Sequence, residues 1–209
     1  MSAFEFFFSF YGLLLGLSVA ELVGGFARVL HRRKAVRIGW LTPLLAVFVA
    51  IDIVTFWNQA WAIFRFAPFN MALLVVGLAV AAVFYVAASV TFPRESDAAR
   101  DLDDHFWAHR RTVFVCVLLA NLIIVAVFFS ITALTGEIGG LKLGVIFWIG
   151  LSLFTVGTSV AAFAPSRRVV MAALIILVAY HGFSVARSAH ALIEAGGWSL
   201  KAPSAAGGE

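Results

Sequence analysis

The chain has little cysteine and little charge, and both shortages restrict the class of protein it belongs to. Only one of its 209 residues is cysteine, so no disulfide can form within the chain. Charged residues make up 12% and hydrophobic residues 63% of the sequence, whereas a soluble domain is about 25% charged and about 45–50% apolar. These proportions exclude an ordinary soluble domain and indicate an integral membrane protein.

The chain also lacks the motifs of the common enzymes and nucleic-acid-binding proteins. It contains no nucleophile elbow, no phosphate-binding loop, no dinucleotide fingerprint and no zinc-finger spacing. Its net charge of +4 comes largely from loops, a distribution that reflects membrane topology rather than nucleic-acid binding. We therefore expect no cofactor and no nucleic-acid partner, and the sequence does not favour an enzyme.

What the sequence does contain is six apolar segments, each of at least about 20 residues, the length that a membrane-spanning helix needs. The first has no basic residue before it and no cleavage pattern after it, so we expect a mature helix rather than a signal peptide. We predict an all-α polytopic membrane protein, a six-transmembrane-helix bundle within 1–200, with a disordered tail at 201–209. The predicted helices span residues 4–30, 41–63, 71–92, 112–135, 143–163 and 169–193.

Basic residues are concentrated in every second loop, and this distribution predicts the orientation of the chain. Under the positive-inside rule, loops rich in Lys and Arg face the cytoplasm. We therefore expect both termini outside. The excess of Arg over Lys and the Ala- and Val-rich helices favour a bacterial cytoplasmic (inner) membrane. The basic loop residues are Arg32, Arg33, Lys34, Arg37, Arg94, Arg100, Arg110, Arg111, Arg167 and Arg168.

The long polar loop at 93–111 divides the chain into two halves of three predicted helices each. Halves with an odd number of helices enter the membrane from opposite sides, so they are either inverted repeats or six unrelated helices. Within this loop Ser96 can cap a helix, and Leu102 and Phe106 would share one apolar face. We predict a helix at 96–109 that lies on the cytoplasmic surface.

The same loop carries a candidate metal site. Asp101, His105 and His109 recur every four residues, so a helix would place them on one face. Two histidines four residues apart can chelate a divalent metal, with the aspartate as third ligand. The alternative is a solvated polar face on which Arg100 pairs with Asp104.

Small residues recur at the same spacing in the first predicted helix. Gly12, Gly16, Ala20 and Gly24 form this small-residue stripe. Such a pattern lets a second helix approach closely. The stripe predicts either packing inside the protein or an interface with a second copy or a partner membrane subunit.

Two acids lie inside predicted membrane helices, where an unpaired charge costs several kcal/mol. At about 1.5 Å per residue, Glu21 and Asp52 lie at similar depths on either side of the first basic loop. We expect the two carboxylates to approach each other, in which case one holds a proton at neutral pH. Arg28, on the same face as Glu21, is the alternative partner.

Further polar side chains occur at a comparable depth. Asn121 lies in the fourth helix and His181 in the sixth, and Gln59 shares a face with Asp52. Proton relays and substrate sites are found in such layers near the bilayer midplane. The alternative is a purely structural network between the two acids and His181. The predicted intramembrane cluster consists of Glu21, Arg28, Asp52, Gln59, Asn121 and His181.

Two strings in the chain resemble a known group of proteins. They are YGLLLGLSVAELVGGFARVL in the first helix and TFPRE followed by DLDDHFWAHRR around the central loop. The chain is similar in these to a widespread group of small uncharacterised bacterial six-helix integral membrane proteins. The resemblance implies the fold and a bacterial source and carries no activity.

Three functional hypotheses follow from these residues. The first is a small transporter or channel for protons or a small solute, with Glu21 and Asp52 as the protonatable pair and His181 as relay or gate. The second is a non-catalytic subunit or scaffold that binds a partner through the small-residue stripe. The third is a membrane enzyme with a metal at His105 and His109. The lipid bilayer is a partner in all three.

Overall fold

The computed structural model describes residues 3–34, 36–64, 70–94, 101–134 and 143–194, which contain six α-helices and no strand. All six are long and apolar enough to cross a membrane, so the predicted all-α bundle is confirmed and the chain is a multi-pass membrane protein. The tail at 201–209 lies outside the described residues. The helices are α1 (Ala3–His31), α2 (Leu41–Phe64), α3 (Met71–Thr91), α4 (Leu102–Leu134), α5 (Val145–Phe163) and α6 (Arg167–Glu194).

The predicted surface helix at 96–109 differs from what the structure shows. From Leu102 onward these residues belong to α4, one continuous helix of 33 residues, and 95–100 lie outside the described part. No Gly or Pro interrupts the sequence between Leu102 and Leu134, so nothing breaks the helix at the predicted boundary. At about 1.5 Å per residue α4 is longer than the membrane core, and its first turns extend beyond it.

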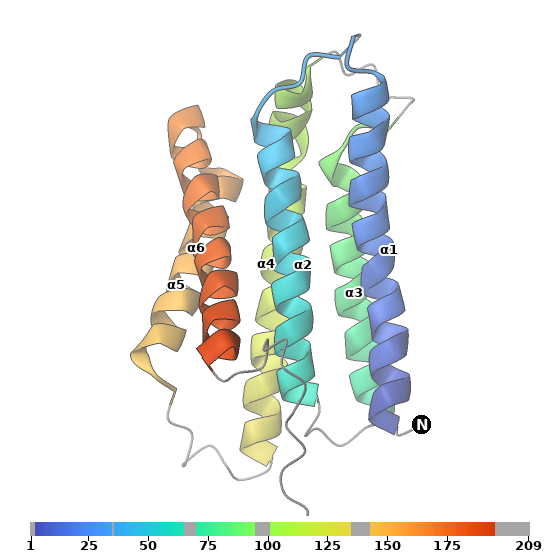
Figure 1. The fold of residues 1–209 in the computed structure, drawn as a ribbon, viewed down its shortest axis with the longest axis vertical. Coiled ribbons are helices and arrows are strands. Elements are labelled where there is room, and N and C mark those ends of the chain that lie inside the picture. The colour runs from blue at the N-terminus through green and yellow to red at the C-terminus, as the bar shows by residue number, and fades with distance from the viewer. Residues whose placement is uncertain (1–2, 35, 65–69, 95–100, 135–142, 195–209) are drawn as a thin grey trace, which may run out of the picture.

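Two helices occupy the middle of the bundle (Figure 1). α2 and α4 contact each other, with α1 and α3 on one side and α5 and α6 on the other. Within the described residues α1 and α3 contact neither α5 nor α6. The two sequence halves also differ in their contacts, because α1 packs against α3 whereas α4 does not contact α6. The described helices therefore do not repeat one three-helix arrangement.

Aromatic side chains packed directly against the backbone hold α1 in place. A Cβ built on Gly25 would lie 2.6 Å from Cδ2 of Phe92, which follows α3, and one on Gly12 would overlap the Trp57 ring of α2. Lipid tails are as apolar as the helices, so tight packing of this kind drives association in membranes. The buried face of α1 is thus directed at α2 and α3.

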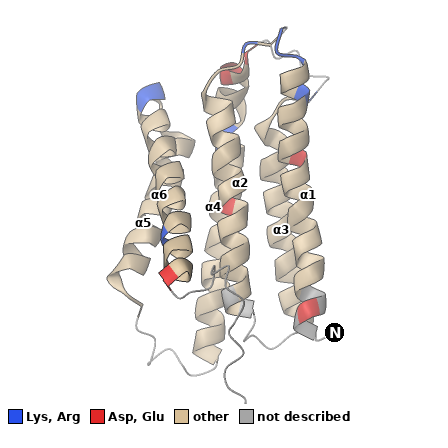
Figure 2. Ribbon diagram, in the orientation of Figure 1, with Lys and Arg blue, Asp and Glu red and all other residues tan. Residues whose placement is uncertain are grey.

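Charged residues gather at one end of the bundle, here called the basic end (Figure 2). It holds the residues that follow α1 and the first turns of α2, α4 and α6. Asp103 of α4 forms an ion pair with Arg167 of α6 and accepts a hydrogen bond from the Leu41 backbone N–H of α2 at 3.4 Å. Thr42 Oγ1 also donates to the Leu102 carbonyl at 2.7 Å. These contacts, the Asp103 latch, join three helix starts.

Candidate functional site

Asp52 lies in the middle of α2 and is the most deeply enclosed acid among the described residues. Its side chain is 1% exposed, and Oδ2 accepts a hydrogen bond from Asn121 Nδ2 of α4 at 2.9 Å. The same amide nitrogen donates to the Val117 carbonyl of its own helix at 3.0 Å. These bonds fix the Asn121 amide, so it presents a donor to the carboxylate without further ordering.

His181 of α6 completes the contact from the other side. Its Nε2 lies 3.7 Å from Asp52 Oδ1, and the ring is buried. Nε2 has no hydrogen-bond partner among the described residues, while Nδ1 lies 3.4 Å from Thr55 Oγ1 of α2. A separation of 3.7 Å exceeds a hydrogen bond, so a small displacement of α6 toward α2 is enough to form one. We call Asp52, Thr55, Asn121 and His181 the buried polar cluster.

Aromatic rings surround the His181 side chain of this cluster. The His181 ring centroid lies 5.9 Å from that of Phe48, 5.8 Å from that of Phe154 and 5.5 Å from that of Tyr180. An apolar enclosure strengthens the interaction between charged groups and makes an unpaired charge costly. A charge on Asp52 or on His181 is therefore costly here unless the other group offsets it.

Glu21 does not join this cluster. Its Oε1 accepts from Arg28 Nη2 at 3.0 Å, seven residues along the same helix, and the two side chains are 28% and 35% exposed. No hydrogen bond or ion pair of the described residues links Glu21 to Asp52, and α1 does not contact α4 or α6. Of the remaining predicted members, Gln59 is exposed, further along α2. The structure brings together Asp52, Asn121 and His181, and it gives Glu21 the alternative partner Arg28.

The members of the small-residue stripe also differ in their surroundings. Gly12 is enclosed by Trp57, but a Cβ on Gly16 would meet nothing within 4 Å, and Ala20 is exposed. Gly24 lies near the Arg28 side chain of its own helix. Beyond Gly12 the stripe therefore faces away from the described helices, and the tight contact of α1 is made at Gly25.

The candidate metal ligands are engaged with other groups. His105 Nε2 donates to the Val90 carbonyl at 3.0 Å, and His109 Nδ1 is hydrogen-bonded to the His105 carbonyl at 3.1 Å. Asp101 accepts from the Asp103 backbone N–H at 2.8 Å and lies 3.8 Å from Arg37. The described residues contain no group of three His, Cys, Asp or Glu placed to hold a metal. The alternative pair, Arg100 and Asp104, includes a residue outside the described part.

Sequence reasoning missed two features. Arg110, assigned to a loop, is a buried residue of α4 that donates to the Ala161 carbonyl of α5 at 3.1 Å and lies over the Trp107 ring. The Trp107–Arg110 spacing of one helical turn was a signal for this stacking. The Asp103 latch was also missed, because its members are far apart in the sequence.

Comparisons of the chain with protein-family models, with curated proteins and with solved structures found no match. Function is therefore inferred from the side chains, chiefly those of the buried polar cluster. Its distinctive property is a carboxylate and an imidazole that contact each other from different helices deep inside a membrane bundle.

Proposed function

We propose that the protein is a small transporter or channel that moves protons, or a small solute together with protons, through the buried polar cluster. The observation that supports this is the contact of Asp52 with His181 across the α2–α6 interface, at 3.7 Å and with both side chains buried. Ionisable side chains at such depth in a membrane are costly and mark ion or proton pathways. Asn121 orients the carboxylate by its hydrogen bond.

Placement of the cluster between different helices supports transport over a purely structural role. Asp52 and His181 belong to helices that contact each other, so a change in the proton they share changes the attraction between α2 and α6. A proton can thereby be coupled to a movement of α5 and α6 relative to the other four helices. The Glu21–Arg28 pair lies within one helix and offers no such coupling.

Proton flux into proteoliposomes under an imposed pH gradient tests the proposal. Asp52→Asn keeps the size of the side chain but removes its exchangeable proton, so we expect flux to fall at least about tenfold. His181→Gln should act in the same direction. Glu21→Gln is the matched control, because it removes an acid of the same membrane domain outside the cluster. Unchanged proton flux in Asp52→Asn would refute the proposal.

Orientation and membrane are part of the same proposal. The basic end faces the cytoplasm of a bacterial cell, with both termini outside, because basic side chains are concentrated at that end. The resemblance of the first-helix and central-loop strings to bacterial membrane proteins supports the location. A phosphatase that folds only outside the cell, fused to the C-terminus, should be active, and a fluorescent protein that folds only inside should not.

A second candidate function is that of a membrane subunit that binds a second copy or a partner through α1. It is favoured by the open space at Gly16 and by the partly exposed Glu21–Arg28 pair further along α1, since a charge pair facing lipid is costly. Gly16→Leu should then shift the protein to a smaller species in mild detergent. Gly182→Leu is the matched control, since Gly182 is an exposed helical glycine on α6 that also has nothing within 4 Å. Equal migration of both variants and the wild type would remove this candidate.

A further inference from the structure

The α2–α6 interface can be compared on the two sides of the buried polar cluster. Both helices begin at the basic end and run in the same direction (Figure 1). The Asp52–His181 contact is therefore a common reference point, and on both helices the residues that follow it lead away from the basic end. One half of the interface leads from the cluster to the basic end, and the other leads to the opposite end.

The half toward the basic end is apolar and closed. On α2 it contains Leu45 and Phe48, and on α6 it contains Leu174 and Leu177, each 0% or 1% exposed. At its limit the Asp103 latch ties the first residue of α6 to α4 and to the start of α2. Nothing polar interrupts the packed side chains between the latch and the cluster on these two faces.

The other half is polar, and its exposure increases with distance from the cluster. On α2, Thr55 is half-buried and Gln59 is exposed; on α6, Ser184 is half-buried and Ser188 is exposed. Both helices place these residues three and seven positions after the cluster residue, so each set continues the face that carries Asp52 or His181. We call Thr55, Gln59, Ser184 and Ser188 the polar track.

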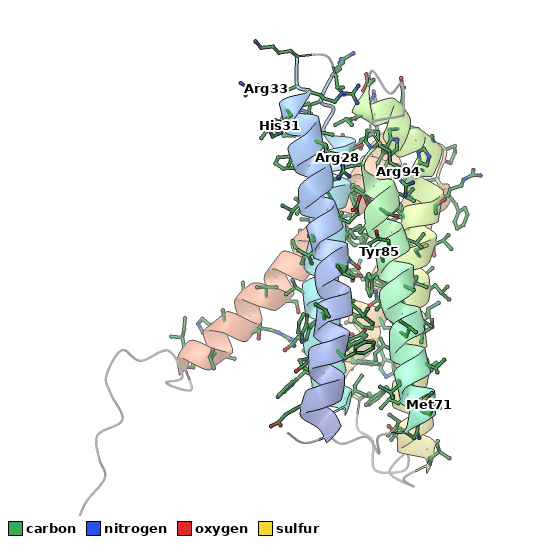
Figure 3. The ribbon with its side chains drawn as sticks, turned by 90° about the vertical axis from the view of Figure 1, so that its right-hand side faces the viewer. Arg28, His31, Arg33, Met71, Tyr85 and Arg94 are labelled. Atoms are coloured by element: carbon green, nitrogen blue, oxygen red, sulfur yellow. The ribbon has the colours of Figure 1, made fainter. Side chains whose placement is uncertain are left out.

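α6 also separates from the bundle along this half. His181 is its last buried residue within the described range, and every position from Gly182 to Glu194 is exposed or half-buried. Figure 3 shows the end of α6 leaning away from the other helices. Space beside the polar track therefore widens toward the end of the bundle opposite the basic end.

We propose that water enters from the end opposite the basic end along the polar track, and that in this conformation Asp52 and His181 exchange protons with that side. This rests on the proposed function and adds the direction of access to it. Hydroxyl and amide side chains at successive turns provide hydrogen-bond partners for water, which the apolar half does not. Thr55 Oγ1, 3.4 Å from His181 Nδ1, is the innermost group of the track.

Cysteine accessibility tests this path in the full-length protein. In a Cys116→Ala background, single cysteines replace Gln59, Ser188, Leu45 or Leu174, and a membrane-impermeant cationic thiosulfonate is added to either side of oriented vesicles. Only a thiolate in contact with water reacts, so we expect Gln59→Cys and Ser188→Cys to label at least about tenfold faster from the side opposite the basic end. Leu45→Cys and Leu174→Cys should resist the reagent from both sides.

A control at a lipid-facing position distinguishes a cysteine exposed to water from one exposed to lipid. Phe183 is 66% exposed but points away from the track, so Phe183→Cys should remain unlabelled. Labelling of Gln59→Cys and Ser188→Cys at the Phe183→Cys rate would show that the track faces lipid and would overturn the inference. So would labelling of Leu45→Cys or Leu174→Cys from the basic end. Reaction after denaturation measures the total thiol in each variant.

Failure of the path and failure of the proposed function give different results. If Asp52→Asn abolishes proton flux but the track cysteines do not react, the transport function stands and this path is wrong. If the track cysteines react as expected but Asp52→Asn leaves flux unchanged, the water path stands and the transport function is wrong. The labelling does not depend on any flux measurement.

Discussion

Glu21 and Asp52 occur in membrane helices that contact each other, yet their surroundings differ in kind. Glu21 forms an ion pair with Arg28 of its own helix, and both side chains are about one-third exposed. Asp52 is 1% exposed and contacts Asn121 of α4 and His181 of α6. Glu21 is paired within a single helix, whereas Asp52 links three helices.

Glu21 is therefore paired by a local contact within α1, whereas Asp52 depends on tertiary contacts. The Glu21–Arg28 pair can persist whatever the neighbouring helices do, because its geometry is set by α1 alone. The Asp52 contacts exist only while α2, α4 and α6 keep their present arrangement. Only contacts between helices, such as those of Asp52, can make the stability of the bundle or a movement of α6 depend on protonation.

The largest effect on stability is expected from removing the donor to Asp52. Asn121→Leu leaves a buried carboxylate without its 2.9 Å hydrogen bond, which should lower the unfolding free energy by about 2 kcal/mol. Replacing both partners, Asp52→Leu with Asn121→Leu, should recover most of that loss, because the carboxylate and the amide that bonded it are then removed together. Unfolding by titration with a denaturing detergent measures each variant.

Gln59→Leu is the control for this experiment. It makes the same amide-to-leucine change on an exposed side chain of α2, so we expect a change within about 0.5 kcal/mol. If Asn121→Leu costs no more than Gln59→Leu, Asp52 does not depend on this bond. The contrast drawn between the two acids would then be wrong.

The sequence predicts the position of a polar residue along its membrane helix better than the direction in which its side chain faces. Counting residues from the basic loop placed Asp52, Asn121 and His181 in one layer, and the structure brings these three together. The same count included Glu21, because distance along a helix says nothing about which face turns toward a neighbour. That choice depends on packing around α1, where Gly12 receives the Trp57 ring and Gly25, outside the small-residue stripe, receives the Phe92 ring.

Contacts between segments far apart in the chain could not be predicted from the sequence either. Arg167 and Asp103 are separated by 64 positions, and their pairing depends on where α6 begins relative to α4. The predicted surface helix failed for a local reason instead. The polar composition of its residues suggested a separate element, but a helix continues through polar residues wherever no Gly or Pro stops it.

A smaller effect is expected at the Glu21–Arg28 pair, and the two single variants should differ. Arg28→Leu leaves Glu21 in the apolar span without its cation and should cost about 1 kcal/mol. Glu21→Leu should cost less, because Arg28 lies near the basic end, where its long side chain can reach water by itself (Figure 3). Detergent unfolding of both singles and the double variant gives the coupling between them. A larger loss in Glu21→Leu would mean that Glu21 has a partner besides Arg28.

The smallest effect is expected at His109 of α4, which resembles Glu21 in being bonded within its own helix. It is exposed and hydrogen-bonded to the His105 carbonyl, so His109→Gln should change the unfolding free energy by no more than about 0.5 kcal/mol. Zinc provides the sharper measurement, because a bound metal at 100 times its dissociation constant stabilises a protein by about 2.7 kcal/mol. We expect equal unfolding curves for wild type and His109→Gln with and without zinc, since His105 Nε2 already donates to Val90. Stabilisation by zinc in the wild type but not in His109→Gln would establish a metal site and make this histidine pair, like Asp52, more than a local contact.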